Sequence, residues 1–489
     1  MTLGADSAGR AGKFGPGSVW AVVFRPRMLR GLRRSTAAAM VGVMGLVGSM
    51  IGSGPASAQG IPLIRDTEIE NLLNDYARPI FKAAGLGTGR VAMRIVRSDV
   101  FNAFVVDGRN VFVHTGLLTQ ANNPNEVIGV IAHEAGHISG GHMAALRARI
   151  AKDQTRALLI QILGLAAVIG GAVSGGDTGR EVAQGGQGVL FGGNEIVMRS
   201  LLAERRSQES AADQAGLSFL LSTGQSGRGM LETFERFAQQ EYISDTHKDP
   251  FVRSHPVATD RLNQLRRLVQ QSPHYNATDS PELQMRHDLM RAKLAGYLDP
   301  PSAVFNRYPV SNMTLPARYA RAIARYHTGG HGALEAAIAE IDTLIRDKPD
   351  NGYFWEVKGD LLMRSGKAAL AIPPLRKALS ILGNASLVQV QLATALQQAG
   401  GPAGMAESIA LLRKSLIDDK NPRAYRLLAT AYFNDGRRPE ADAMIAQAHF
   451  LEGDIPKAQI FAKRAQGALK PGTPEWLKND DILSFKPQT

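Results

Sequence analysis

The most informative segment of the sequence is Asn123-Pro-Asn-Glu-Val-Ile-Gly-Val-Ile-Ala-His-Glu-Ala-Gly-His137, because it combines a helix start, an apolar face and an H-E-x-x-H motif. Asn123 suits the N-cap, a proline follows at the first helical position, and Glu126 stands at the capping-box position. His133 and His137 then share one face of the helix. They can take two corners of a tetrahedral zinc site, so the stretch predicts the helix of a zinc hydrolase.

Glu134 lies beside the first histidine, where its carboxylate is angled toward a water molecule at the metal rather than toward the metal. This position suits a general base. With 11 histidines in 489 residues, an H-E-x-x-H match is expected by chance about once in a hundred such chains. The alternative, a helix that carries two surface histidines, fits poorly with the apolar turns before the motif, which indicate a buried helix.

A third ligand is needed, and its position decides the class of enzyme. Metzincins place a further histidine six residues after the second one, but here that position is Met143, and His142 comes one residue too early. Glu209-Ser-Ala-Ala-Asp213 follows in a segment with helical spacing of apolar residues. We expect Glu209 as the third ligand, and Asp213 can hold the far nitrogen of a zinc-bound histidine. A solvated acidic pair is the alternative, and nearby small residues, which favour close helix packing, weigh against it.

These motifs, preceded by Asn102-Ala-Phe104 and Thr115-Gly-Leu-Leu118, resemble the HtpX/CAAX-protease group of gluzincin metallopeptidases. Within that group the chain looks most like the periplasmic member that assists β-barrel assembly. The resemblance is close over roughly residues 60 to 270. It implies one Zn²⁺ per chain, held by the two histidines and the glutamate, and it implies protein or peptide substrates.

Alternating apolar residues predict three short strands before the H-E-x-x-H helix, over residues 91–95, 102–106 and 111–114. A turn at Asp107–Gly108 joins the last two as a hairpin. A peptide can add to the open edge of such a strand, so that the scissile amide is aligned at the metal. The family resemblance implies the same role for Asn102, Ala103 and Phe104. A purely structural hairpin is the alternative.

The segment Ser254-His-Pro-Val-Ala-Thr-Asp-Arg261 places a histidine before a proline, and therefore in a loop. In the resembled family the matching His255 and Arg261 lie at the active-site cleft. The resemblance implies that His255 can reach the metal as an inhibitory fourth ligand. Arg261 is expected either to bind the oxyanion or to orient a ligand. From the residues alone, His255 is equally an ordinary loop histidine, and Arg261 a solvated helix charge.

The first 58 residues have the features of a secretory signal peptide, with five arginines between positions 25 and 34, an apolar run over 37–51 and an A-x-A site at 56–58. Cleavage near Ala58 and Gln59 predicts a periplasmic protein. The apolar run is short for a membrane span, and an uncleaved anchor is the alternative. Translation can start at Met1 or at Met28.

The stretch 157–193 begins almost wholly apolar and becomes rich in glycine. It is too short and too broken by glycine for a membrane span. We expect a helix followed by a loop that borders the active site, as a lid or as a flap that contacts the membrane.

Composition narrows the chemistry. There is no cysteine, so thiolate zinc ligands and disulfides are excluded. The net charge is +12, but the first 58 residues hold seven basic residues and one acidic residue, a net +6, which leaves +6 for the rest. With such a mild excess and no basic-aromatic motif, nucleic-acid binding is not expected.

The last third of the chain repeats. Gly330, Gly366, Gly400 and Gly436 are spaced by 36, 34 and 36 residues. An aromatic residue precedes three of these glycines by eleven positions: Tyr319, Trp355 and Tyr425. The spacing resembles tetratricopeptide repeats, which are helix pairs that stack into a surface for peptides or proteins. The segment over 455–469 is expected to be the last helix.

We therefore predict a mainly α protein, in which a gluzincin protease domain with a small β-sheet precedes an α-solenoid. The expected parts are a signal peptide (1–58), a zinc metallopeptidase domain (59–272), a helical linker (273–301), the repeats (302–470) and a C-terminal tail (471–489). The predicted function is hydrolysis of misfolded or misassembled envelope proteins, and the resemblance implies outer-membrane assembly machinery as a partner of the repeats. The alternative is a chaperone or adaptor with secondary proteolysis. An exopeptidase is disfavoured because no amine-binding motif is found near the edge strand.

Overall fold

A computed structural model describes residues 62–87, 89–106, 108–145, 148–149, 203–240 and 259–486. The predicted signal peptide, the stretch 157–193 and His255 lie outside these ranges.

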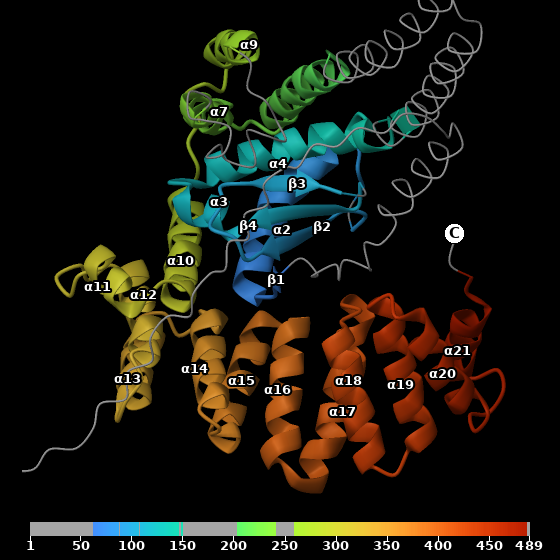
Figure 1. The fold of residues 1–489 in the computed structure, drawn as a ribbon. Helices are drawn as coiled ribbons and strands as arrows, with labels where there is room; N and C mark the ends of the chain where they lie inside the picture. Colours follow the sequence, from blue (N-terminus) through green and yellow to red (C-terminus); the bar gives the residue numbers. More distant parts are fainter. Residues whose placement is uncertain are drawn as a thin grey trace, which may run out of the picture. The chain divides into compact units, whose positions relative to one another are not determined.

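The described chain is mainly helical and contains one small sheet, which confirms the predicted fold class (Figure 1). The first elements are β1 Leu63–Ile64, α2 Thr67–Ala83, β2 Ala92–Val96, β3 Ala103–Val105, β4 Asn110–His114, α3 Thr115–Gln120, α4 Pro124–Ser139, a helix over 203–222, α7 Arg228–Gln240 and α9 Thr259–Gln270. Two connecting helices follow, α10 Pro281–Leu298 and α11 Pro301–Arg307. The remaining helices are α12 Leu315–His327, α13 Ala333–Asp347, α14 Gly352–Arg364, α15 Ala368–Leu382, α16 Ser386–Ala399, α17 Gly401–Asp418, α18 Pro422–Asn434, α19 Arg438–Leu451, α20 Ile455–Gln466 and α21 Pro474–Ser484.

The sheet has the strand order β1-β2-β4-β3. Strands β2 and β4 run parallel, whereas β1 and β3 pair antiparallel with their neighbours. Phe104 pairs with Phe112 in the centre of the β3–β4 hairpin, and Gly108 adopts a positive φ of 73° in its turn. Because only glycine takes this backbone conformation without strain, the turn forms where the sequence predicts it.

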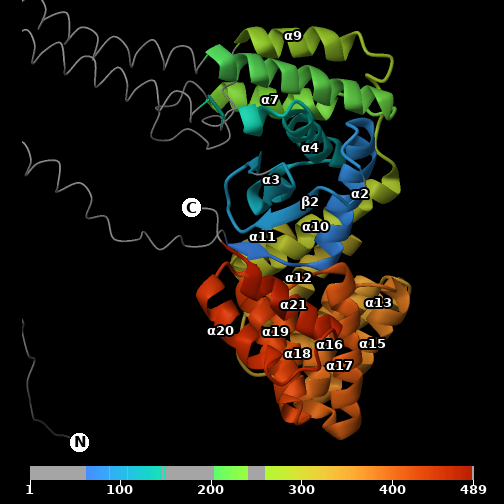
Figure 2. The ribbon, with the colours of Figure 1, turned by 90° about the vertical axis from the view of Figure 1, so that its right-hand side faces the viewer.

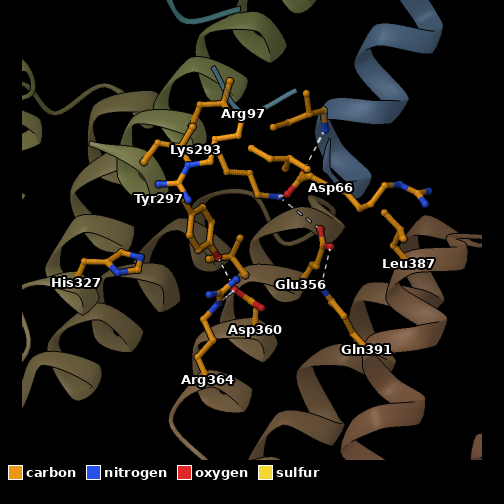
Figure 3. A pocket seen from close by; sticks show the side chains of 16 residues that line it. Asp66, Arg97, Lys293, Tyr297, His327, Glu356, Asp360, Arg364, Leu387 and Gln391 are labelled. Atoms are coloured by element: carbon orange, nitrogen blue, oxygen red, sulfur yellow. Dashed lines mark hydrogen bonds and ion pairs between the residues drawn. The ribbon is translucent and has the colours of Figure 1, made fainter. Parts of the chain in front are cut away.

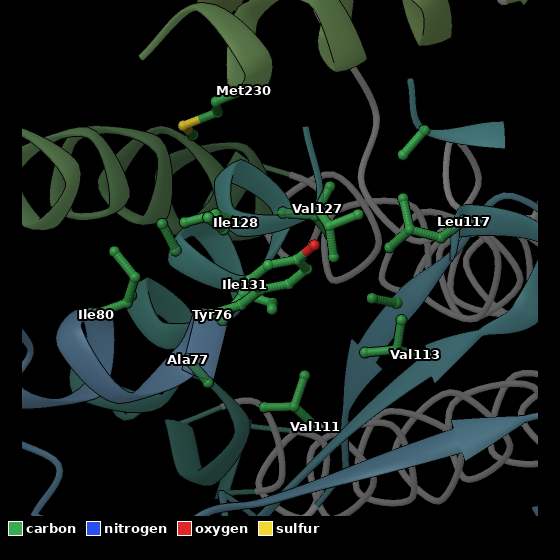
Figure 4. Close-up of a cluster of buried hydrophobic side chains, with 14 of the residues drawn as sticks. Tyr76, Ala77, Ile80, Val111, Val113, Leu117, Val127, Ile128, Ile131 and Met230 are labelled. Atoms are coloured by element: carbon green, nitrogen blue, oxygen red, sulfur yellow. The ribbon is translucent and has the colours of Figure 1, made fainter. Parts of the chain in front are cut away.

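The hydrophobic core of the domain that contains the sheet lies between the sheet, α2 and α4 (Figure 4). Tyr76 and Ile80 of α2 and Ile131 of α4 are buried there with Val111 of β4. Figures 1 and 2 show α7 and α9 on the side of α4 that faces away from the sheet. Helix α4 is therefore covered on both sides, which explains why it is apolar almost all round. Its burial positions the two histidines within the domain.

Helix α2 continues through Pro79 to Ala83. Tyr76, Ile80 and Phe81 are buried on both sides of the proline. The apolar surface that they bury outweighs the loss of one backbone hydrogen bond.

Helices α12 to α21 form successive antiparallel pairs, and each pair contacts the next, as expected for an α-solenoid of tetratricopeptide type (Figure 1). Gly330, Gly366 and Gly436 have positive φ values of 81°, 72° and 78° in the turns within pairs. Gly400 does not, because the left-handed residue of that turn is Gly401, with φ 62°. The turn is thus one residue later than predicted.

The predicted C-terminal tail is partly folded. Helix α21 lies within 471–489 and packs against α20 and α19, so that α20 is not the last helix. Ile482 of α21 is buried with Ala458 and Ala462 of α20. Thr473 caps α21 by accepting a hydrogen bond from the Trp476 backbone N–H.

Every helix within the described ranges is too short or too polar to span a lipid bilayer.

Candidate metal centre

Helix α4 begins as the sequence predicts. The side chain of Asn123 accepts a hydrogen bond from the backbone N–H of Glu126 at 3.0 Å. The Glu126 carboxylate reaches back to the N–H of Asn122 at 3.1 Å and forms an ion pair with Arg236 of α7 at 2.7 Å. These contacts fix the start of α4, and therefore fix where its histidines fall.

Glycines bring α4 and the helix over 203–222 into close contact. A Cβ added at Gly136 would lie 2.6 Å from the carbonyl oxygen of Ala212, and one added at Gly216 would lie 2.9 Å from the carbonyl oxygen of Ala132. No larger residue fits at either position while the helices keep this distance. The small residues of the acidic motif thus allow the approach that places Glu209 beside the histidines.

Three ligand atoms from the two helices converge on one point. His133 Nε2 and His137 Nε2 are 3.1 Å apart, and each lies 3.4 Å from an oxygen of Glu209. A zinc ion with ligand distances of about 2.0–2.1 Å in tetrahedral geometry requires ligand atoms about 3.3 Å apart. The three side chains, all buried, therefore fit a zinc ion.

Charged groups contact two of the three ligand side chains and hold them in position. Asp213 accepts from His133 Nδ1 at 2.9 Å, which directs Nε2 toward the other two ligands. Arg261 of α9 donates two hydrogen bonds to Asp213, at 2.7 and 2.9 Å, and its Nη1 lies 3.3 Å from Glu209. Of the two roles expected for Arg261, these contacts favour the orientation of a ligand.

The electrostatic balance of the cluster is negative. Burial by itself lowers the pKa of His133, but Asp213 and Glu209 outweigh it and raise the pKa to about 9. Burial acts to raise the pKa of Asp213, and its hydrogen bonds to His133 and Arg261 outweigh that effect and lower it. A site that favours positive charge on an imidazole also favours a divalent cation.

Glu134 is buried one position after His133 and is not one of the three converging groups. It is held in the protein interior on the same helix as both histidines. A carboxylate that lies next to metal ligands without being one of them is suited to accept a proton from water.

His142 is a member of the site that the motif alone does not predict. It stands one residue too early for a metzincin ligand, but its Nδ1 lies 3.0 Å from Nδ1 of His137. It therefore contacts the outer nitrogen of His137 as Asp213 contacts that of His133. The sequence does show a third histidine shortly after the motif. What it does not show is the turn after α4, at Gly141 with φ 64°, that brings this histidine back toward His137.

The predicted substrate strand lies at a sheet edge. Strand β3 pairs with β4 on one side, and within the described ranges no strand pairs with its other side. Ala103 is buried, and Phe104 stacks on Phe112 with ring centroids 5.1 Å apart. The carbonyl oxygen of Asn102 accepts from the His114 N–H at 2.9 Å. Strand β3 also contacts α4, so this edge adjoins the helix that carries the cluster.

Comparison with known proteins agrees with this geometry. Residues 64–269 match the model of Peptidase family M48. The beta-barrel assembly-enhancing protease of Yersinia pestis is 26% identical over 381 residues, covering 77% of this chain and 74% of the relative. The protein of the same name from Escherichia coli K12 is 24% identical over 386 residues, covering 76% of this chain and 73% of the relative.

Two further similarities cover less of the chain. Metalloprotease YcaL of Escherichia coli K12 is 28% identical over 170 residues, which span 35% of this chain and 58% of the relative. A solved structure of MamA matches 36% of this chain and 99% of its own length, with 22% identity and a TM-score of 0.29. From the family match and the metalloprotease relatives, residues 64–269 constitute a peptidase family M48 domain, and the chain is a metalloprotease.

Proposed function

We propose that the chain is a periplasmic zinc endopeptidase that cleaves misfolded or misassembled envelope proteins. We also propose that its domains have the boundaries predicted from the sequence. The observation that supports peptide-bond hydrolysis is the convergence of His133, His137 and Glu209 on the helix pair that also holds the buried Glu134. The relatives named beta-barrel assembly-enhancing protease support the choice of substrates. The signal-peptide features of the first 58 residues support the periplasm.

His133, His137 and Glu209 would hold the zinc ion, and when bound it polarises the scissile carbonyl and makes water a stronger nucleophile at neutral pH. Glu134 accepts the proton of the attacking water on its carboxylate and later passes it to the leaving amine. Asp213 keeps Nδ1 of His133 protonated, so that Nε2 carries the lone pair. Arg261 holds Asp213 in place through two hydrogen bonds and Glu209 through an ion pair.

We infer that the substrate backbone adds to strand β3 at Asn102, Ala103 and Phe104. An edge strand offers unpaired amide and carbonyl groups to an extended peptide and does not depend on its side chains. Such binding suits an enzyme that meets unfolded segments of many sequences. The contact of β3 with α4 supports this role, because it brings the edge close to the helix of Glu134.

His255 is proposed as a brake on the enzyme. The family resemblance implies that this loop histidine can take a fourth position at the metal, and a neutral imidazole there excludes the water that Glu134 needs. A His255→Ala variant should cleave faster than wild type while it binds the same amount of zinc. Cleavage at or below the wild-type rate would assign His255 a structural or substrate-side role.

The proposed hydrolysis is tested by two variants of neighbouring glutamates. Glu209→Gln should lower zinc occupancy, because it replaces a charged carboxylate ligand by a neutral amide, which binds zinc more weakly. Glu134→Gln should keep zinc and lose hydrolysis of an unfolded protein such as casein. Zinc is measured by mass spectrometry, and activity with and without a chelator. If Glu209→Gln keeps full occupancy, the third ligand lies elsewhere.

A chaperone or adaptor remains the second candidate, because helices α12 to α21 form a large repeat surface. The same Glu134→Gln variant separates the two functions in a cell that lacks the wild-type protein. Rescue of envelope assembly by this variant would favour the adaptor, and failure to rescue would favour proteolysis.

A further inference from the structure

The last repeats contain a groove that none of the contacts described above uses. It is formed by residues of α17, α18, α19 and α21 and of the link after α17, and it encloses a cavity of about 570 Å³. A cavity of this size accommodates a few amino-acid side chains.

The rim of the groove is positively charged. Its cations are Arg413, Lys414, Lys420 and Lys478, all exposed. Among the described residues none of these four forms an ion pair, and Glu475 is the one carboxylate in the lining. Three other arginines of these repeats form ion pairs with carboxylates across neighbouring helices, Arg376–Glu407, Arg426–Glu452 and Arg464–Asp442. With four cations and one carboxylate around a single cavity, the groove carries a local excess of positive charge.

The floor of the groove is apolar. Tyr425, Leu428 and Tyr432 of α18 line it together with Met444 of α19. At the edge, the side chain of Ile417 is 78% exposed. An exposed isoleucine beside an apolar floor gives a partner a place to bury its own apolar side chain.

We propose that this groove binds an acidic peptide segment of another protein, one that carries carboxylates beside an apolar side chain. The carboxylates meet the unpaired cations of the rim, and the apolar side chain enters the floor. This proposal rests on the proposed function, because binding in the groove would select the segments that the repeats present to the protease. It is a binding property, and it can be measured without hydrolysis.

The shape of the site favours a peptide over a lipid surface. A bilayer contacts projecting groups on a flat or convex face, whereas the apolar residues of the floor lie within the cavity and only Ile417 projects at its edge. Anionic lipid is nevertheless attracted to the same cations, and the experiment distinguishes the two.

The test uses the full chain with Glu134→Gln, so that the probe is not cut. A fluorescein-labelled peptide of alternating Glu and Leu is titrated by fluorescence anisotropy, and a second peptide has Gln in place of Glu. Lys414→Glu with Lys420→Glu should weaken binding of the acidic peptide about tenfold or more, because each change replaces attraction by repulsion. The matched control is Lys377→Glu with Lys463→Glu, which changes the net charge equally at two exposed lysines outside the groove.

The proposal holds if only the groove variant loses affinity, if the Gln peptide binds weakly, and if circular dichroism shows both variants folded. Equal losses in the groove and control variants would overturn it in favour of general charge attraction. Binding of phosphatidylglycerol vesicles that the groove variant loses, without binding of the peptide, would overturn it in favour of a membrane contact. The same lysine variants are also made in the chain that keeps Glu134, and their hydrolysis of casein is measured. This assay tests the protease separately, so that failure of one proposal does not affect the other.

Discussion

At the scale of single residues, both histidines of the motif have their outer nitrogen engaged. His133 Nδ1 meets Asp213 at 2.9 Å, and His137 Nδ1 meets His142 Nδ1 at 3.0 Å. A histidine that binds a metal through Nε2 carries its proton on Nδ1 and donates it to such a partner. His142 is then the acceptor, and it fixes the ring of His137.

We predict that His142→Leu weakens zinc binding about tenfold, because His137 loses the acceptor that orients it. His142→Gln keeps an acceptor atom and should lose less. Zinc affinity is measured by competition with a chromophoric chelator, independently of activity. Unchanged affinity in the leucine variant would show that the contact does not hold the ring.

At the scale of elements, helix contacts made through glycine decide the geometry of the site. Gly136 faces Ala212 of the acidic helix, whereas Gly129 of the same helix α4 faces Met230 of α7, and a Cβ there would lie 2.7 Å from the Met230 Cα. The two glycines therefore serve two different interfaces.

Gly136→Ala should push the acidic helix away from α4, and it should lower both stability and zinc affinity. Overpacking of this kind costs about 1–3 kcal/mol. Gly129→Ala is the matched control, because it should destabilise the domain to a similar extent through α7 while zinc affinity stays close to wild type. Chemical denaturation and chelator competition give the two quantities. If both variants lose zinc equally, general loosening of the domain explains the effect.

A buried histidine ties α10 to α2 and to the end of α3. His287 Nε2 contacts the carbonyl oxygen of Ala121 at 3.0 Å, and Nδ1 contacts the hydroxyl of Tyr76 at 3.0 Å. Because a carbonyl only accepts, Nε2 carries the proton, and Nδ1 accepts from the tyrosine. Burial lowers the pKa of His287 to about 4.

This pKa predicts a stability that falls in acid. Between the ordinary pKa of 6.5 and the folded pKa of about 4, the unfolded chain binds a proton that the folded chain does not. The free energy of unfolding should therefore fall by roughly 3 kcal/mol as the pH drops through this window. His287→Gln also offers one donor and one acceptor but cannot ionise, so its stability should depend less on pH. Parallel curves for the two proteins in urea titrations across this pH range would refute the assignment.

At the scale of the whole molecule, one buried lysine holds three parts of the chain together. Lys293 of α10 lies 2.8 Å from Asp66 at the start of α2 and 3.7 Å from Glu356 of α14 (Figure 3). It also lies 3.3 Å from Glu68 of α2. Burial raises the pKa of both glutamates, and the lysine opposes that rise. Tyr319 of α12 adds a hydrogen bond to Glu68 at 3.0 Å. The cluster joins the protease domain to the first repeats.

Lys293→Met should be strongly destabilising, because it leaves three carboxylates without their cation. Removal of one partner from a buried ion pair costs roughly 3–5 kcal/mol. Lys358→Met is the control within α14. Its ion pair with Asp342 is partly exposed, and such pairs contribute about 0–1 kcal/mol. Calorimetry of the two variants compares the losses, and similar melting temperatures would show that Lys293 is not the joint.

Features that depend on neighbours along the chain could be predicted from the amino-acid sequence. The start of α4, the common face of His133 and His137, and the β3–β4 hairpin follow from capping, helical periodicity and turn chemistry. The glycine spacing likewise predicted the helix pairs, with one turn misplaced to Gly400. Capping, helical periodicity and turn chemistry act within a few residues, and each repeat is a helix pair formed by one continuous segment, so these features do not depend on distant parts of the chain.

The contacts between groups that are distant in the sequence could not be predicted in this way, because they depend on how the helices pack. Arg261 contacts Asp213 across 48 positions of the sequence, and Thr67 contacts Glu356 across 289. Arg261 alone is consistent with an oxyanion ligand or a solvated charge, and Lys293 with an ordinary surface lysine. Their roles arise because helix packing removes them from water, where each charge is stable only beside its partner. Helical periodicity marks a buried face, but it does not identify the residue that packs against it.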